Sequence, residues 1–225
     1  MRSSRPVTIR AAVLVFAAAG ASACLARAGA TAVPPPVVDL PLASETGKAS
    51  AVLAGGCFWG IEAVFEHVRG VIRATSGYAG GTAETAQYDI VSGGRTGHAE
   101  AVEVVYDPSQ ITYGQLLHVF FSVAHDPTEL NRQGPDVGPQ YRSAIFPASA
   151  DQARIARAYI SQLNRAAAFR RTVVTEVTAL PRFYHAEPEH QDYAARHPTA
   201  PYIVMHDAPK VERLRQAFPD RYVAR

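Results

Sequence analysis

Apolar residues recur along the chain with two different periods, which predicts a mixture of strands and helices. After Gly60 and after Thr112 they lie three and four residues apart, as in helices that bury one face. Before Tyr106 they alternate, as in a strand with one face in the core. The predicted strands cover residues 50–54, 71–78, 98–106, 141–146 and 172–179. The predicted helices cover residues 61–70, 112–126, 149–167 and a last segment from Pro209.

The order of these elements predicts the fold class. The first six run strand, helix, strand, strand, helix, strand, which is the order of a split βαβ, or ferredoxin-like, unit. We expect an α+β fold with a two-layer core and a mixed sheet, to which extra helices and a long coil-rich C-terminal part are added. A single domain at residues 46–225 is the simplest account of the pattern.

The N-terminus has the pattern of a cleaved leader. Three arginines precede an apolar stretch at residues 11–20 that is too short to span a bilayer. Small residues before Cys24 and before Thr31 offer cleavage sites, so residues 1–30 are predicted to be a signal peptide of a periplasmic or otherwise exported protein. A lipid anchor on Cys24 and a basic N-terminus of a cytosolic protein are the alternatives. Residues 31–45, with three consecutive prolines, are predicted to be a linker.

Charge and cysteine content narrow the function classes. The chain has 225 residues and a formal net charge of +2, and its scattered basic residues argue against nucleic-acid binding. It has only two cysteines, Cys24 and Cys57. If Cys24 is removed or lipidated, Cys57 is the sole thiol of an exported protein, where a free thiol is a liability unless its reactivity is used. A buried inert cysteine and a Cys24–Cys57 disulfide are the alternatives.

Cys57 lies in the segment Gly-Gly-Cys-Phe-Trp-Gly, between a predicted strand and a predicted helix. Backbone N–H groups at the start of a helix favour a thiolate over a thiol, so this position predicts a nucleophile. Phe58 and Trp59 follow, and we expect one or both to face out of the turn and to form a pocket for a small apolar group. Aromatic residues at a helix start are also common in cores, so the segment alone leaves both interpretations open.

Glu100 has the same parity as Val102 and Val104 in its predicted strand, so it is expected to face the core. Burial raises the pKa of a carboxyl group, which keeps the group protonated near neutral pH and lets it act as a general acid. A bulge that turns Glu100 outward and a buried ion pair are the alternatives. His98 lies on the same face of the predicted strand and is the candidate partner of Glu100 in such an ion pair.

The motifs around these residues resemble those of a known family. Gly-Cys-Phe-Trp-Gly is followed by Thr-Gly-His-Ala-Glu, which ends at Glu100. Further matching segments are residues 78–81, Tyr88, residues 131–143 and residues 183–193. From Ala51 to Tyr222 the chain resembles the peptide methionine sulfoxide reductase A family, and the cysteine motif with its spacing to the glutamate is highly specific.

The resemblance implies a peptide-methionine (S)-S-oxide reductase, which repairs oxidised proteins and also reduces the free amino acid. Cys57 would attack the sulfoxide sulfur and become a sulfenic acid, while Glu100 would give a proton to the sulfoxide oxygen. Two tyrosine hydroxyls would hydrogen-bond that oxygen, and two aromatic side chains would enclose the S-methyl group. The implied catalytic residues are Cys57, Glu100, Tyr88, Tyr141 and Asp136, and the implied substrate-binding residues are Phe58 and Trp59.

The chain departs from the family in its recycling cysteines. Many members carry them near the C-terminus, whereas the matching residues 197–202 contain none. We therefore expect a one-cysteine cycle in which an external thiol reduces the sulfenic acid of Cys57: a thioredoxin-like protein, glutaredoxin with glutathione, or dithiothreitol. No bound cofactor or metal is expected. The expected partners are oxidised proteins or peptides, free methionine sulfoxide and the thiol reductant, with a membrane only if Cys24 is lipidated.

Two other classes of protein remain as alternatives at this point. The first is a cysteine hydrolase or acyltransferase in which a histidine activates Cys57, with His98, His185 and His190 as candidates. The second is an exported binding module in which Cys57 has only a structural role.

Overall fold

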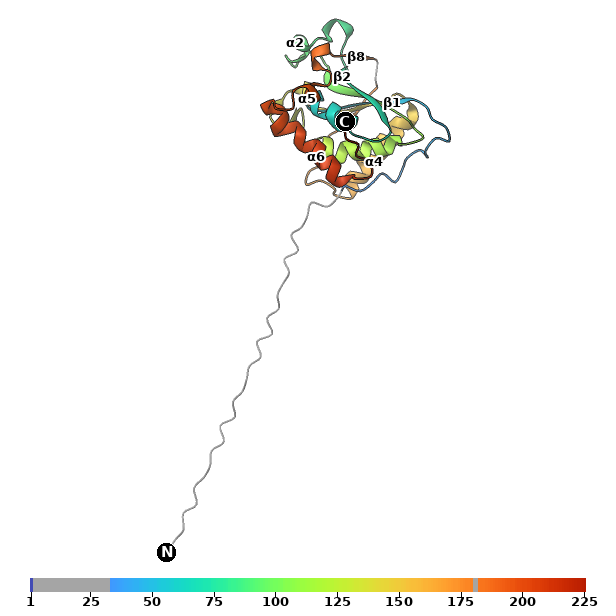
Figure 1. Ribbon diagram of the computed structural model, residues 1–225, viewed down its shortest axis with the longest axis vertical. Helices are drawn as coiled ribbons and strands as arrows, with labels where there is room; N and C mark the ends of the chain where they lie inside the picture. The colour runs from blue at the N-terminus through green and yellow to red at the C-terminus, as the bar shows by residue number, and fades with distance from the viewer. Residues whose placement is uncertain (2–32, 180–181) are drawn as a thin grey trace. The chain divides into compact units, whose positions relative to one another are not determined.

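The computed structural model describes Met1, residues 33–179 and residues 182–225. The predicted signal peptide beyond Met1, including Cys24, lies outside these residues. The strands are β1 (Ala49–Gly55), β2 (Val71–Ala79), β3 (Ala99–Tyr106), β4 (Arg132–Gln133), β5 (Asp136–Val137), β6 (Ser143–Phe146), β7 (Glu176–Val177) and β8 (Phe183–His185). The α-helices are α1 (Phe58–Glu66), α2 (Tyr88–Val91), α3 (Tyr113–Val119), α4 (Ala150–Arg165), α5 (Tyr193–Arg196) and α6 (Ala208–Ala217) (Figure 1).

The main sheet has the strand order β7-β6-β1-β3-β2-β8. β3 lies between β1 and β2 and is antiparallel to both, and β6 pairs with the other edge of β1, also antiparallel. A chain that crosses from β1 through α1 to β2 and returns through β3 has the connectivity of a split βαβ unit. β7 pairs with β6 in parallel, so the predicted mixed sheet and α+β class are confirmed.

The two faces of the sheet bury different side chains. One face packs against α1, α3 and α4 in a large apolar cluster that includes Leu53, Val102, Val104, Ile61, Leu116 and Ile155. The opposite face carries a smaller cluster made mostly of alanines, with Val52 and Phe146. The face that meets α1 therefore also fixes the first turn of α1, where Cys57 lies.

Two predicted strands are wrong in part. Only Glu176–Val177 of the expected strand 172–179 joins the sheet, because the Val173 N–H donates to Asn164 Oδ1 and the Val174 N–H to the Pro127 carbonyl. Tyr141 belongs to a 3₁₀ turn, Pro139–Tyr141, and the strand starts at Ser143.

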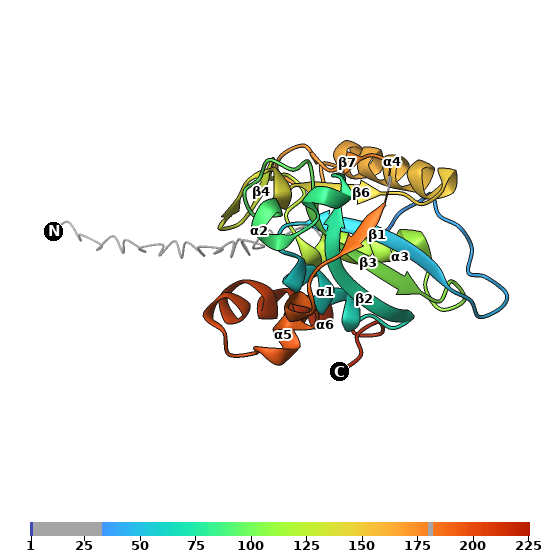
Figure 2. The same cartoon turned by 90° about the horizontal axis from the view of Figure 1, so that it is seen from above.

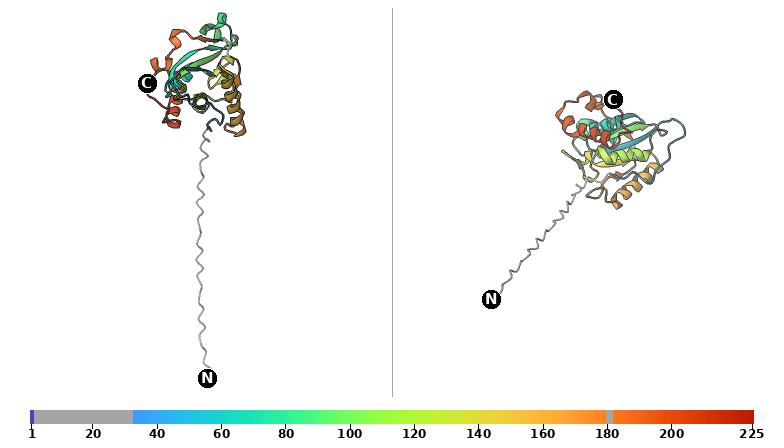
Figure 3. Two further views of the ribbon diagram at one scale, coloured as in Figure 1. Left: turned by 90° about the vertical axis from the view of Figure 1, so that its right-hand side faces the viewer. Right: turned by 60° about the horizontal axis from the view of Figure 1, so that its bottom comes forward.

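The C-terminal part of the chain gathers beside α1. Figure 2 shows α5 and α6 next to α1, whereas α4 lies at the β6–β7 end of the sheet. The left view of Figure 3 shows the same separation, with the gold α4 and the red α6 on opposite sides. The predicted last helix, α6, thus covers α1 together with α5, which lies in a stretch expected to be coil.

The part of the predicted linker that the structure describes packs on the domain. The Tyr159 hydroxyl of α4 donates to the Pro34 carbonyl at 2.6 Å, and the Gln162 side chain binds both Pro35 and Val37. Asp39 lies at the N-terminus of α3, where it accepts hydrogen bonds from the Thr112 hydroxyl and from the Gly114 N–H. Both predicted cleavage sites precede Val33, so a processed chain would keep this strap, residues 33–39.

Replacing Asp39 by alanine should destabilise the domain by about 1–2 kcal/mol, because the Gly114 N–H and the Thr112 hydroxyl would lose their acceptor at a helix N-terminus. The measurement is the urea midpoint of unfolding. Asp39→Asn is the matched control: it keeps an acceptor oxygen and should lose less than the alanine variant. Equal stability of Asp39→Ala and the parent would show that the strap does not contribute to the fold.

Candidate active site

Cys57 occupies the N-cap position of α1, directly after the end of β1. The preceding Gly56 has φ +96°, and a Cβ there would collide with the Gln133 side chain of the β4–β5 hairpin. Only glycine fits this left-handed position, so the turn that presents Cys57 depends on it. Cys57 is 7% exposed, so the residue that would carry the chemistry is buried.

The electrostatics of Cys57 differ from the prediction. The nearby N–H of Trp59 lowers the pKa of the thiol, as expected at a helix N-terminus. Burial has the larger effect, however, and together with the charges of Glu100 and Asp207 it raises the pKa of Cys57 well above its ordinary value. The resting group is therefore a thiol, and its ionisation depends on the charges around it.

Glu100 faces the same core as Val102 and Val104, as the alternation along β3 predicts. The residue is 2% exposed, and its Oε2 accepts a hydrogen bond of 3.0 Å from the Phe58 N–H. Burial raises its pKa to about 8 despite this hydrogen bond, so most of the group is protonated at pH 7. A neutral carboxyl thus lies against the residue that follows Cys57.

His98 is not the partner of Glu100. Its Nδ1 accepts from the Gly81 N–H at 3.2 Å, and its Nε2 lies 2.9 Å from the Thr82 carbonyl. These contacts tie His98 to the loop after β2. The ion pair considered for Glu100 is therefore absent between these two residues.

Phe58 and Trp59 have different environments. Phe58 is 1% exposed, and its ring packs on the core between Tyr78 and His190, so Phe58 is not the one of the two aromatic residues that faces out of the turn. Trp59 is half-buried and stacks on Tyr193 of α5 with ring centroids 3.8 Å apart. Of the two aromatic residues, Trp59 is therefore the one that stays partly exposed.

The three other predicted residues come from separate loops. Tyr88 begins α2, Tyr141 ends the Pro139–Tyr141 turn, and Asp136 belongs to the β4–β5 hairpin. Burial first and the charge of Glu100 second raise the pKa of both tyrosines, and the charge of Cys57 contributes to each. Both tyrosines therefore lie within electrostatic range of Cys57 and Glu100.

Four residues without a role in the predicted reductase site complete it. The Tyr202 hydroxyl donates to Asp136, and the charges of Cys57 and Asp136 act on this tyrosine. Glu187 accepts from the Tyr88 N–H at 2.9 Å and from the Tyr78 hydroxyl at 2.8 Å. The remaining two are His190, whose ring centroid is 4.3 Å from that of Tyr88, and Tyr193. Three of the four lie in the matching segment 183–193, but nothing in their spacing indicates what they contact.

The histidines do not form a catalytic dyad with Cys57. Within the described part of the chain, no hydrogen bond joins Cys57 to His98, His185 or His190. His185 is exposed beside Phe183, and His190 is held among aromatic rings, where burial lowers its pKa. None of these three histidines is therefore placed as the general base of a cysteine hydrolase.

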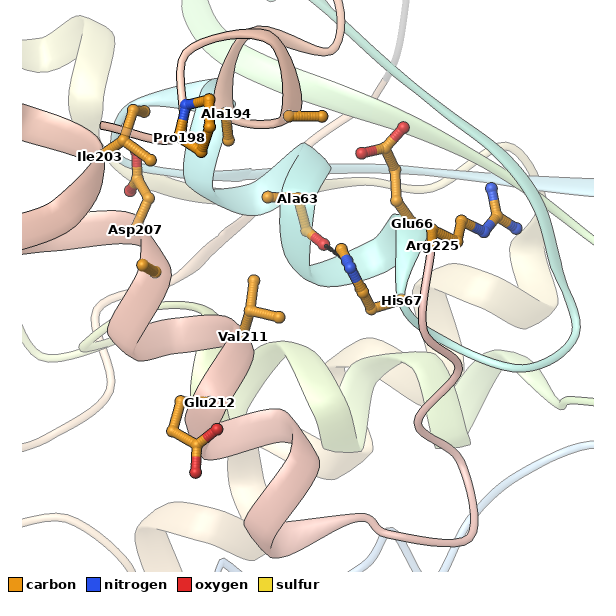
Figure 4. A pocket seen from close by; sticks show the side chains of 12 residues that line it. Ala63, Glu66, His67, Ala194, Pro198, Ile203, Asp207, Val211, Glu212 and Arg225 are labelled. Atoms are coloured by element: carbon orange, nitrogen blue, oxygen red, sulfur yellow. Dashed lines mark hydrogen bonds between the residues drawn. The ribbon is translucent and has the colours of Figure 1, made fainter. Parts of the chain in front are cut away.

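A cavity of about 420 Å³ lies between α1 and the C-terminal helices. Figure 4 shows Ala63, Val211 and Pro198 around it, with Glu66, His67 and Arg225 at one end. Cys57 and Glu100 are not among its lining residues. The cavity is therefore separate from the candidate site.

Two structural absences concern residues 33–179 and 182–225 together with Met1. No group of three or more histidine, cysteine, aspartate or glutamate side chains is placed to hold a metal ion there. No helix among them is long and apolar enough to cross a membrane. Cys24 lies outside these residues, so its predicted lipidation stays a prediction.

Known proteins resemble this chain over its whole folded part. The sequence profile of the family described as "Peptide methionine sulfoxide reductase" matches residues 49–222. "Peptide methionine sulfoxide reductase MsrA 2" of Synechocystis sp. is 53% identical over 194 residues, 85% of this chain and 91% of the relative. The protein of that name from Mesorhizobium japonicum is 54% identical over 176 residues, 78% of this chain and 90% of the relative.

Solved structures agree with these relatives. The methionine sulfoxide reductase A of Corynebacterium diphtheriae is 37% identical, with a TM-score of 0.59 over 74% of this chain and 87% of that one. Reduced Mxr1 of Saccharomyces cerevisiae is 30% identical, with a TM-score of 0.63 over 70% of this chain and 92% of that one. A cysteine at a helix start beside a neutral buried glutamate, on a domain that these relatives match nearly end to end, identifies the chain as a member of the peptide methionine sulfoxide reductase A family and as an oxidoreductase.

Proposed function

We propose that this reductase acts on the S epimer of methionine sulfoxide, in proteins and as the free amino acid, through a sulfenic acid on Cys57 that an external thiol reduces. Methionine sulfoxide reduction for protein repair is the activity of its family. The observation that carries the proposal is the neutral, buried Glu100, hydrogen-bonded to the residue next to Cys57. A sulfoxide oxygen leaves sulfur readily only after protonation, and Glu100 holds such a proton next to the nucleophile.

The proposed step transfers one oxygen and two electrons. The Cys57 sulfur, as thiolate, bonds to the sulfoxide sulfur while Glu100 protonates the sulfoxide oxygen. The resulting hydroxyl group then moves to the Cys57 sulfur as the S–O bond and the new S–S bond break. Methionine leaves as the neutral thioether, Cys57 is a sulfenic acid, and Glu100 is left as a carboxylate. A first external thiol then forms a mixed disulfide with Cys57 and releases water, and a second thiol frees Cys57 and leaves as a disulfide.

The surrounding residues have proposed roles in binding. The hydroxyl groups of Tyr88 and Tyr141 donate to the sulfoxide oxygen as charge develops on it, and Asp136 orients the loop side of the site through Tyr202. Trp59, with Phe58 behind it, takes the S-methyl group. The nucleophile, the oxygen donors and the methyl pocket each fix one direction around the pyramidal sulfur. Because three directions are fixed, only one of the two epimers fits.

Recycling by an external thiol is proposed from the sequence. Residues 197–202 contain no cysteine, and Cys24 lies well before the strap that begins at Val33. Thioredoxin-like proteins and glutathione with glutaredoxin are the proposed thiol donors. Export to the periplasm, with or without a lipid on Cys24, is likewise a proposal, and the mass of the mature chain tests it.

Two synthetic peptides test the function, each with a single methionine sulfoxide of defined configuration. In the presence of dithiothreitol, the S peptide should lose one oxygen and the R peptide should stay unchanged in mass spectrometry. Without added thiol, one equivalent of S peptide should be reduced, and Cys57 should react with a sulfenic-acid trap. An unchanged S peptide, or equal reduction of both epimers, would contradict the proposal.

A further inference from the structure

An ion pair that the proposed scheme does not use lies beside the first turn of α1. Asp207 ends the π-helical turn Ile203–Asp207, and Lys210 lies in the first turn of α6. Their side chains are 0% and 10% exposed, and Lys210 Nζ is 3.0 Å from Asp207 Oδ1. The other carboxylate oxygen, Oδ2, is buried with no hydrogen-bond partner. Burying such a pair is expensive and often gains no stability over apolar residues, so a role beyond packing is indicated.

The pair touches the backbone that presents Cys57. Gly60 is the third residue of α1, and a Cβ at this position would collide with both Asp207 Oδ1 and Lys210 Nζ. Figure 4 shows the Asp207 side chain directed from the C-terminal segment toward α1. Only a residue without a side chain lets the two charged groups approach this turn so closely.

Both charges act on Cys57. The carboxylate of Asp207 raises the pKa of the Cys57 thiol and that of Glu100, whereas the ammonium group of Lys210 lowers the pKa of Cys57. The ionisable groups that face Cys57 from the elements around it are Glu100, Tyr88, Tyr141, Tyr202, Asp207 and Lys210. Lys210 is the cation in this set, so it is the natural counter-charge for a thiolate.

We propose that Asp207 and Lys210 are a positioning pair for Cys57: packed against Gly60 in the first turn of α1, Asp207 fixes Lys210 as the compensating cation for the sulfur. The proposal rests on the proposed role of Cys57 as the nucleophile. The reactive form needs a negative sulfur and a neutral Glu100 at once. Lys210 stabilises the negative sulfur. Asp207 stabilises the neutral form of Glu100 and also fixes Lys210 in place.

The test measures how fast iodoacetamide alkylates Cys57 as a function of pH, in a Cys24→Ser background so that only one cysteine reacts. The reagent reacts with the thiolate, so the rate follows the ionised fraction. Asp207→Asn should speed alkylation and Lys210→Met should slow it, each by about three- to tenfold below the pKa of Cys57. The alkylation rate of the double variant should return toward that of the parent, because the charges of Asp207 and Lys210 have opposite effects on Cys57.

The opposite directions separate this role from a structural one, since a loosened turn would shift both variants the same way. Glu212→Gln with Arg215→Met removes an exposed pair of the same helix, 2.7 Å apart, and should leave the profile unchanged. If Lys210→Met does not fold, Asp207→Asn and the double variant decide. The proposal would be overturned if the variants and the parent had the same alkylation rate at every pH, or if both single variants changed the rate in the same direction. Alkylation needs no sulfoxide, so this result stands apart from the peptide assay.

Discussion

Replacing Cys57 by serine should abolish reduction of methionine sulfoxide while the domain stays folded. The step needs an atom that can both attack the sulfoxide sulfur and accept its oxygen equivalent, and sulfur does this through the sulfenic acid. A serine hydroxyl is a far weaker nucleophile at neutral pH and cannot be oxidised in this way. Because the exchange is nearly isosteric at a 7% exposed position, the circular dichroism spectrum should not change. The measurement is turnover of the S peptide with dithiothreitol.

The chain offers a matched control in its second cysteine. Cys24→Ser makes the same chemical change outside the residues that the structure describes, and in the one-cysteine cycle it should leave turnover with dithiothreitol at the parent rate. If the Cys57→Ser variant still reduced the S peptide, Cys57 would not be the nucleophile. Normal turnover by Cys57→Ser together with loss in Cys24→Ser would move the chemistry to the other cysteine. Loss in both variants would instead indicate that Cys24 resolves the sulfenic acid of Cys57.

The elements next to the site were predictable because their patterns are local. The apolar run of β1, its glycine turn and the alternation along β3 each encode one element, and each lies where the sequence predicts. The same alternation predicts that Glu100 lies on the face of β3 that is directed toward the core. The strand predicted at residues 172–179 had an equally regular pattern, but long-range hydrogen bonds to Asn164 and Pro127 use its backbone instead.

The rest of the site depends on contacts between distant segments. Tyr202 meets Asp136 across 66 positions, and Glu187 meets the Tyr88 N–H across 99. No periodicity within either segment encodes such a meeting. The state of Cys57 was mispredicted for a related reason: position at a helix start is visible in the sequence, whereas the burial that outweighs it is a property of the folded chain.

Replacing Glu100 by glutamine should slow reduction of the S peptide by about 10²–10⁴-fold at neutral pH, because the amide cannot donate the proton that lets oxygen leave. Geometry should survive, since the glutamine Oε1 can still accept the Phe58 N–H. Above about pH 8, where Glu100 of the parent is ionised, thiol alkylation of Cys57 should become faster in the same variant, because the charge of Glu100 raises the pKa of this thiol. Slower reduction with faster alkylation is a combination that misfolding would not produce. The measurements are single-turnover rates and iodoacetamide rates on one preparation.

The pH profile gives the sharper distinction. The reactive form has a thiolate at Cys57 and a proton on Glu100, and the pKa of Glu100, about 8, lies below that of Cys57. Below pH 8 the thiolate fraction grows with pH while Glu100 stays protonated, so the parent rate should rise. Above about pH 8 the loss of the Glu100 proton cancels the gain in thiolate, and the rate should level off.

Glu100→Gln has no such proton to lose, so its low rate should keep rising through pH 8 until Cys57 itself is ionised. Glu62→Gln is the matched control, because Glu62 is a buried carboxyl of α1 whose pKa burial raises to about 7, but it binds the Ser76 and Asp192 N–H groups instead of the active site. The reduction rate of Glu62→Gln should level off at the same pH as that of the parent. A plateau near pH 8 that persists in Glu100→Gln would assign the titration to another group and remove Glu100 as the proton donor.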